Sequence, residues 1–241
     1  MKFVKMSAGL LLSACLALSV SCNSGGDKKD DKTATDSAAP AMAAPPATPK
    51  DVITIKHKVA NYAKWKVGYD SGDSIRLANG LHSYVIGRGL EDSNMVMVAM
   101  FMDDIDKAKA FAANPVLKEQ MKKAGVISTP EIDYIHRVSS DTTTLPSMDR
   151  VVIKHKVKDF DVWKKVYDDH KQARMDAGLT DRSVSHTVGD NHRVSLVFAF
   201  SDMAKAKAFM NSKDLADKMK AGGVEGPPTS FMYRVVQLIK P

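Results

Sequence analysis

Hydrophobic and polar positions alternate along several short stretches of the chain. The first, VITIKHKV at residues 52–59, has an apolar residue or a histidine at every second position, which predicts a strand with one buried face. Aromatic residues at helical spacing follow over residues 61–80, where the closing glycine is typical of the position just past a helix. Two strands, a second helix capped again at Asn114-Pro115, and a final strand complete the order βαββαβ.

This pattern occurs twice, and the two copies lie 98 residues apart. The pentapeptide IKHKV stands at residues 55–59 and again at 153–157. The offset holds along the whole predicted fold without a gap, which indicates a tandem duplication. We predict two ferredoxin-like units, at 51–138 and 150–241, joined by a linker at 139–149. Pairs kept at this offset include Trp65/Trp163, Tyr69/Tyr167, Arg76/Arg174 and Gly80/Gly178.

One strand in each copy is apolar on both faces. The stretches MVMVAMF at 95–101 and VSLVFAF at 194–200 carry apolar residues at odd and even positions, which implies burial on both sides. Right-handed crossovers place both helices of a βαββαβ unit on one face of its sheet. A single copy would therefore leave an apolar face in water. We expect an α+β fold in which the two units pack sheet to sheet as an intramolecular α+β barrel.

The N-terminal segment, residues 1–21, predicts a signal peptide. Lys2 and Lys5 precede an apolar run that is too short for a membrane span, and small residues follow. The string SVSC resembles the lipobox of bacterial lipoproteins, which implies that Cys22 is lipidated and becomes the mature N-terminus. Cys15, at the end of LSAC, is the alternative processed cysteine, and an ordinary signal peptide with an incidental cysteine is another.

Residues 22–50 are rich in Ala, Pro, Thr, Lys and Asp and contain no aromatic residue, which predicts a disordered tether. Acyl chains on Cys22 would then be the anchor to the membrane. The predicted location is the cell envelope, as a lipid-anchored protein of the outer membrane of a Gram-negative bacterium. Because both cysteines lie in residues 1–22, no cysteine remains in the folded part for a disulfide or a thiolate nucleophile.

Charge argues against nucleic acid as a partner. The formal net charge is +7, and removal of Lys2 and Lys5 with the signal peptide leaves +5. The remaining lysines are spread through mixed-charge helical stretches such as DDIDKAKAF, which is typical of a solvated helix face. Because no basic stripe is interleaved with aromatic residues, we expect no nucleic-acid binding.

The repeated sequence resembles the dimeric α+β barrel superfamily, which includes antibiotic-biosynthesis monooxygenase-like and cyclase-like proteins. The matching stretches are IKHKVKDFDVWKKVYD, ARMDAG, AKAKAFMNSKDLADKMKAGGV and their partners in the first copy. The resemblance covers nearly all of residues 51–239. It implies the fold but not the activity, because this superfamily hosts oxygenases, cyclases, isomerases and proteins with no known reaction.

Each copy offers a histidine near an aromatic helix face as candidate chemistry. A neutral imidazole at His57 or His155, expected beside the tryptophan, would suit a general base. Tyrosine and arginine on the same helix face would bind a phenol, an enolate or a carboxylate. The alternative is that the whole set is core packing retained in both copies. The candidate ligand-binding residues are Trp65, Tyr69, Arg76, Trp163, Tyr167 and Arg174.

Other motifs carry less information. Asn61 and Trp65 resemble a pair used by cofactor-free or haem-degrading monooxygenases of the superfamily, but the second copy has Asp159 in place of Asn61. The seven histidines show no HExxH spacing, and no GxGxxG, P-loop or GxSxG motif occurs. We therefore expect no metal and no cofactor. The methionine-rich strand at 95–102 is read as adaptable core or, alternatively, as a pocket lining.

Two functions remain open on this basis. The first is an envelope lipoprotein whose duplicated barrel is structural or binds a small apolar or aromatic ligand; the predicted anchor and the lack of a decisive catalytic motif favour it. The second is a cofactor-independent cyclase-like or monooxygenase-like enzyme that uses a barrel histidine. The sequence does not decide whether the protein is an enzyme.

Overall fold

A computed structural model describes residues 51–239 of the chain. The predicted signal peptide, the lipidation site at Cys22 with its alternative Cys15, and the predicted tether lie outside the described residues. None of the helices within 51–239 has both the length and the apolar character that crossing a membrane requires.

The first repeat has the predicted order of strands and helices, with each helical region divided in two. Its elements are β1 (Val52–Lys58), α1 (Tyr62–Ser71), α2 (Asp73–Ala78), β2 (Leu81–Gly89), β3 (Met95–Met102), α3 (Ile105–Ala113), α4 (Pro115–Lys123) and β4 (Glu131–Ser140).

The second repeat follows the same order. Its elements are β5 (Asp149–Val157), α5 (Phe160–Asp169), α6 (Lys171–Asp176), β6 (Leu179–Thr187), β7 (Asp190–Phe200), α7 (Met203–Met210), α8 (Lys213–Ala221) and β8 (Val224–Leu238). The last strand begins seven residues before the predicted stretch FMYRVVQL, because Val224 and Glu225 pair with Val157 and Lys156 of β5.

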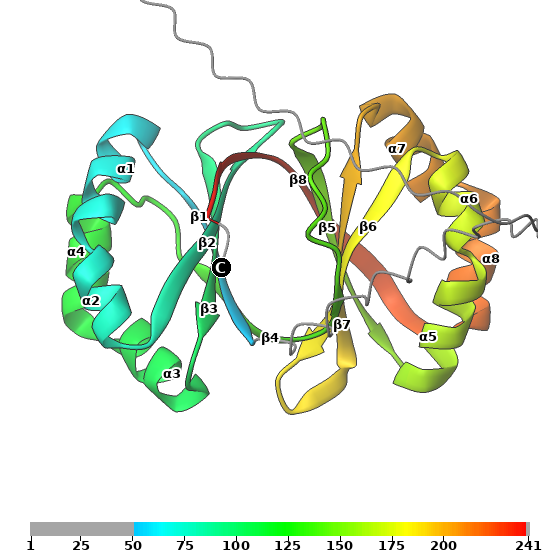
Figure 1. Cartoon of the computed structure of the whole chain (residues 1–241), viewed down its shortest axis with the longest axis horizontal. Coiled ribbons are helices and arrows are strands. Elements are labelled where there is room, and N and C mark those ends of the chain that lie inside the picture. The colour runs from blue at the N-terminus through cyan, green and yellow to red at the C-terminus, as the bar shows by residue number, and fades with distance from the viewer. Residues whose placement is uncertain (1–50, 240–241) are drawn as a thin grey trace, which may run out of the picture. The chain divides into compact units, whose positions relative to one another are not determined.

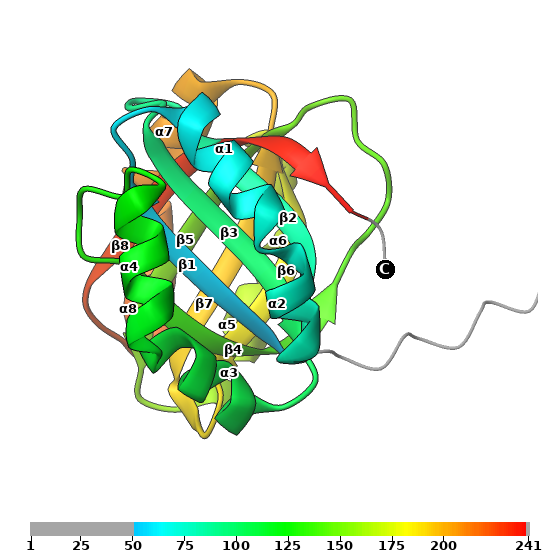
Figure 2. The same ribbon diagram turned by 90° about the vertical axis from the view of Figure 1, so that its left-hand side faces the viewer.

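The eight strands close into one antiparallel barrel, in the order β1-β3-β2-β8-β5-β7-β6-β4. Each repeat supplies four adjacent strands, and the edges of the two sheets pair with each other, β2 with β8 and β4 with β6. The helices of the two repeats cover opposite outer sides of this ring (Figure 1). Figure 2 shows α1, α2 and α4 lying across β1 and β3. The predicted intramolecular α+β barrel is thus confirmed, and no sheet edge is left unpaired in it.

The helix predicted over residues 61–80 is broken at Gly72, and its counterpart is broken at His170. A break leaves a main-chain carbonyl without its helical partner. In the first repeat, Nη1 of Arg76 donates to the carbonyl oxygen of Tyr69 at 2.6 Å. In the second, Nη1 of Arg174 donates to that of Tyr167 at the same distance. The arginine therefore donates to the carbonyl at the break in both repeats, a role that helical spacing alone does not show. In the first repeat the main-chain N–H of Gly72 donates to the same carbonyl, at 3.2 Å.

Two apolar cores lie between the sheet and the helices, one in each repeat. The first gathers Ile53, Ile55, Trp65 and Met100 among others, and the second gathers Val151, Trp163, Leu196 and Phe198 among others. Each core is complete within its own repeat apart from a few neighbours such as Val188 and Leu90. The apolar clusters on the inner side of the barrel are smaller.

The alternation within β1 and β5 explains the repeated pentapeptide. Ile55 and His57 face the helices and are buried there, whereas Lys56 lines the inside of the barrel. In β5 the same phase directs Lys154 inward. Each IKHKV therefore supplies a histidine to a helix layer and a lysine to the lumen.

The lumen differs from the simple apolar contact that the two-sided strands predict. Met97, Ala99 and Phe101 of β3 do face inward and are buried, as expected. Strands β4, β5 and β6, however, direct charged side chains into the same space. The wall between the two sheets is therefore only partly apolar, because a barrel of eight strands encloses more room than its apolar residues fill.

Candidate functional site

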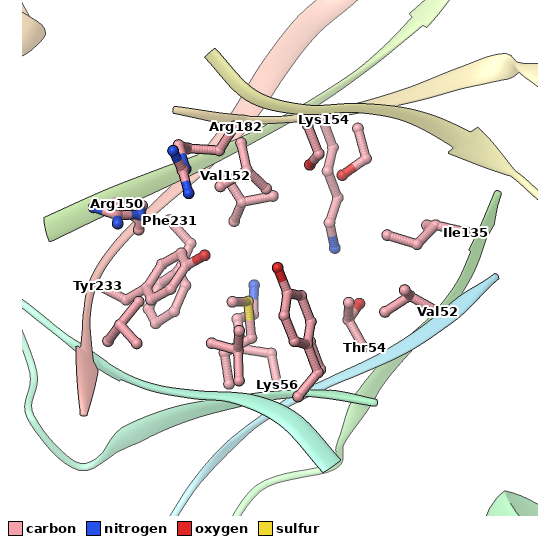
Figure 3. Close-up of a pocket in the computed structure, with 18 of the residues that line it drawn as sticks. Val52, Thr54, Lys56, Ile135, Arg150, Val152, Lys154, Arg182, Phe231 and Tyr233 are labelled. Atoms are coloured by element: carbon pink, nitrogen blue, oxygen red, sulfur yellow. The ribbon is translucent and has the colours of Figure 1, made fainter. Parts of the chain in front are cut away.

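A cavity of about 380 Å³ occupies the lumen of the barrel. This volume lies within the range of about 300–1,000 Å³ that is usual for small-molecule sites. Its wall is partly apolar, with Val52, Val85, Ala99, Val152 and Val197 among the residues that line it. Its polar and charged side chains come from both repeats (Figure 3). The barrel therefore encloses a ligand-sized space with specific polar groups rather than a filled core.

Two lysines and two carboxylates form a chain of ion pairs at one end of this cavity. Nζ of Lys154 lies 2.7 Å from Oε1 of Glu131 and 2.6 Å from Oδ2 of Asp133. Nζ of Lys56 lies 2.7 Å from the other oxygen of Glu131. Burial would lower the pKa of Lys154, but the hydrogen bonds to Asp133 and Glu131 outweigh it and raise that pKa. The two positive and two negative charges balance, so this end of the cavity has no net charge.

Three arginines gather at the other end. They are Arg137 from β4, Arg150 from β5 and Arg182 from β6, and all three line the cavity. Figure 3 shows Arg150 and Arg182 on one side of the cavity and Lys154 on the other. Nη1 of Arg150 donates to the carbonyl oxygens of Ser147 and Asp149, both at 2.8 Å. Burial lowers the pKa of the Arg150 guanidinium, and the positive charge of Arg182 adds to this.

Two tyrosines accompany the arginines. Tyr233 of β8 is 3% exposed, and burial raises the pKa of its phenol above the usual value. Its ring lies so close to Gly87 of β2 that a Cβ at that position would come within 2.2 Å of Cδ2. Tyr84 of β2 stacks at 4.5 Å between ring centroids on Phe101. A neutral phenol can donate and accept one hydrogen bond each, which adds directional contacts to the charge of the arginines.

The two ends of the cavity have different surroundings. Asp141, Thr142 and Met148 of the linker between the repeats line the cavity that holds the arginines. A second hollow of about 560 Å³ adjoins the lysine end, since it shares Ile135, Lys154, Ser195 and Thr229 with the first.

The candidate residues named from the sequence do come together, but outside the lumen. In the first repeat the ring centroids of His57 and Trp65 are 5.6 Å apart, and those of Trp65 and Tyr69 are 5.2 Å apart. The guanidinium carbon of Arg76 lies 3.7 Å from the centroid of Tyr69. Together they form one continuous stack between the sheet and the helices.

The second repeat builds the same stack. His155 and Trp163 are 5.5 Å apart, Trp163 and Tyr167 are 5.1 Å apart, and Arg174 lies 3.7 Å from Tyr167. Here the arginine also makes a bidentate pair with Asp181, at 3.0 and 2.9 Å. The near-identical spacing in both repeats favours packing of the helix layer as the role of this unit.

Both imidazoles are neutral in this setting. Burial lowers the pKa of His57 and of His155 from 6.5 to about 4. Within the described part of the chain, no hydrogen-bond partner reaches any of their four ring nitrogens. Between the sheet and the helices, the space beside His57 measures about 90 Å³ and that beside His155 about 70 Å³. His155 also lines the hollow of about 560 Å³ that adjoins the lumen, whereas His57 does not.

Asn61 and Asp159 have a structural role in common. The side chain of Asn61 accepts from the main-chain N–H of Lys64 and caps α1, and Asp159 accepts from that of Val162 and caps α5. Because either residue can cap a helix, the presence of Asn61 in one repeat and Asp159 in the other is explained without a catalytic role for Asn61. Among residues 51–239 no group of three or more His, Cys, Asp or Glu side chains is placed to hold a metal ion.

Sequence reasoning missed the lumen residues, among them Lys56, Lys154, Arg137, Arg150 and Arg182. The available signal was the strand alternation itself, since Lys56 and Lys154 stand in the phase opposite to the helix-facing residues. The three arginines had no such signal, because the positions 98 residues away from them hold no arginine.

No protein-family model matches this chain, and no curated protein matches it. Among solved structures, an anthrone oxidase-like protein has a TM-score of 0.52 at 14% identity, over 78% of this chain and 92% of that one. A protein provisionally named a monooxygenase, from Fusobacterium nucleatum, has a TM-score of 0.52 at 9% identity, over 80% and 94%. Another of that provisional name, from Lactobacillus acidophilus, has a TM-score of 0.50 at 10% identity, over 78% and 95%.

Identities this low show the fold and not the activity. The shared architecture is a ring of eight antiparallel strands, built here from two βαββαβ units on one polypeptide. The chain therefore has the fold of the dimeric α+β barrel proteins, as a tandem duplication.

Proposed function

We propose that the duplicated barrel is a binding module that holds a small, partly apolar ligand in its lumen. The observation that carries the proposal is the cavity of about 380 Å³, whose wall combines apolar side chains with a few placed polar groups. We further propose that lipid on Cys22 tethers this module to the bacterial envelope, as the N-terminal sequence predicts.

The alternative is a cofactor-independent enzyme that uses His57 or His155. One observation favours it: both imidazoles are held neutral beside small cavities, as a general base requires. The spaces between the sheet and the helices, about 90 and 70 Å³, are too small for an aromatic substrate. An enzyme of this kind would therefore have to use His155 from the hollow of about 560 Å³ that it also lines.

Filling the lumen tests the binding proposal. Ala99 lines the cavity, and Ala99→Leu adds a branched side chain there. Ala110 is exposed on α3, so Ala110→Leu makes the same change away from the lumen. Calorimetric titration with 2-naphthoate and with its neutral isostere 2-naphthamide should detect binding to the parent and to Ala110→Leu. Ala99→Leu should lose it.

Equal binding by Ala99→Leu and by the parent would place the ligand elsewhere and reject the lumen. Loss of binding in His57→Gln or His155→Gln, with Ala99→Leu unaffected, would favour the enzyme instead.

A further inference from the structure

The arginine end of the lumen carries more positive than negative charge. Arg137, Arg150 and Arg182 line the cavity there, and Asp141 is the one carboxylate of the cavity wall beside them. Its Oδ1 lies 3.6 Å from Nη1 of Arg182, a long contact. Asp149 is close in sequence, but its carboxylate accepts from Arg234 at 2.7 and 2.9 Å. Two guanidinium groups are therefore left without a carboxylate among the described residues.

Arg137 shows the imbalance most clearly. Its guanidinium carbon lies 4.9 Å from the ring centroid of Phe101 and 5.8 Å from that of Tyr84. Its Nε is buried and has no hydrogen-bond partner in the part of the chain that the structure describes. A buried N–H of a guanidinium without such a partner is costly, and an anion placed against it would offset that cost.

The fold itself does not need these arginines. By the 98-residue offset, Arg137 corresponds to Val235, Arg150 to Val52 and Arg182 to Tyr84. Those three residues also line the lumen, at equivalent positions of the same closed barrel. At each of these three positions one repeat has an arginine and the other has a valine or a tyrosine; Arg137 belongs to the first repeat, and Arg150 and Arg182 belong to the second. The contrast separates what packing requires from what a ligand requires.

We propose that the arginine cluster binds the carboxylate of an aromatic ligand held in the lumen. This inference rests on the proposed binding function and deepens it. Arginine matches a carboxylate through two parallel N–H donors, and its guanidinium also stacks on rings. Tyr84 and Tyr233 line the cavity beside the cluster and would contact the ring of the ligand. The lysine end does not compete for the carboxylate of the ligand, because Glu131 and Asp133 already neutralise Lys56 and Lys154.

The test compares 2-naphthoate with 2-naphthamide, which have nearly the same shape and differ in charge. The full chain should bind the carboxylate at least about tenfold more tightly, since hydrogen bonds to a charged group are the stronger ones. Arg137→Val installs the residue type of the sister position and should abolish this preference while leaving binding of the amide unchanged. Arg88→Val is the matched control, because Arg88 is a strand arginine stacked at 4.1 Å on Tyr62, in the helix layer.

Four outcomes would overturn the inference. If both compounds bind equally and Ala99→Leu removes both, the lumen binds ligands but the arginines do not select an anion. If Arg137→Val weakens both compounds alike, Arg137 supports the shape of the cavity only. If neither compound binds the parent, the inference and the proposed function are both rejected. Sodium sulfate that competes as well as 2-naphthoate would indicate a site for simple anions and not for aromatic carboxylates.

Discussion

The helix layers and the lumen of this barrel have diverged to different degrees since the duplication. The helix layers repeat almost residue for residue, so that the stack of His57, Trp65 and Tyr69 recurs with centroid distances that agree within 0.1 Å. The lumen repeats only its lysines. Every other charged residue of the lumen, including Glu131 and Arg137, corresponds by the 98-residue offset to a residue of another type in the sister repeat. The helix layers thus keep one packing arrangement in both repeats, whereas the wall of the lumen differs from one repeat to the other at every charged position except the two lysines.

The largest effect should follow from separating the repeats. Residues 51–140 alone would expose the edges of β2 and β4 and the inner face of their sheet, which the second repeat covers in the intact barrel. We expect this fragment to aggregate or to form a homodimer. Sedimentation analysis checks it, and a folded monomer would show that the lumen contact is not needed for stability.

Truncation of the stacked tryptophans should have the next largest effect. Trp65 and Trp163 are 3% and 4% exposed, so replacing either with Ala should cost about 3–5 kcal/mol of unfolding free energy. Denaturant unfolding measures both. Because the stacks match, the two losses should agree within about 1 kcal/mol. A much larger loss in one repeat would break the equivalence of the helix layers.

The two buried imidazoles should make stability depend on acidity. Their pKa is about 4 when folded and about 6.5 when unfolded, so the unfolded chain binds more protons between these values. Stability is therefore retained above pH 6.5 and falls as the pH drops toward 4, by on the order of 1 kcal/mol per unit for each histidine. The double variant His57→Gln, His155→Gln should show a shallower slope than the parent. An unchanged slope would mean that the imidazoles are accessible to protons.

The lysines should differ although the sequence repeats them. Lys154 contacts both Glu131 and Asp133, whereas Lys56 contacts Glu131 alone. Lys154→Met should therefore cost about 1–3 kcal/mol of unfolding free energy, and Lys56→Met less. Thermal unfolding of both variants measures the difference. The reverse order would show that the ion-pair chain is organised around Lys56.

The smallest effect on stability should come from Arg137. It makes no ion pair with any described residue, so Arg137→Val should change the unfolding free energy by no more than about 0.5 kcal/mol or should raise it. Denaturant unfolding without ligand measures this. A loss above about 1 kcal/mol would mean that the arginine holds the barrel together.

The fold could be predicted from the sequence because duplication doubles every signal. The strand alternation around His57, the glycine at position 80 with a φ of 68°, and the repeat of both at His155 and Gly178 all agree on one element order. The break at Asn114 was predicted from the proline that follows it, and α4 begins there. The break at Gly72 was not predicted, since the contact of Arg76 with a carbonyl seven residues earlier has no local sequence signal.

The site was harder to predict for a related reason. Repetition drew attention to His57 and Trp65, which lie between the sheet and the helices and not in the lumen. Arg137, Arg150 and Arg182 stand on three different strands, and only the closure of β4 against β6 and the order of the barrel bring them together. No local pattern encodes that proximity.

The most direct test of the account is a crystal structure of the chain with bound 2-naphthoate. The account predicts the naphthalene ring inside the barrel, with its carboxylate within hydrogen-bond distance of Arg137 or Arg150. A ligand between the sheet and the helices, against His57 or His155, would contradict it.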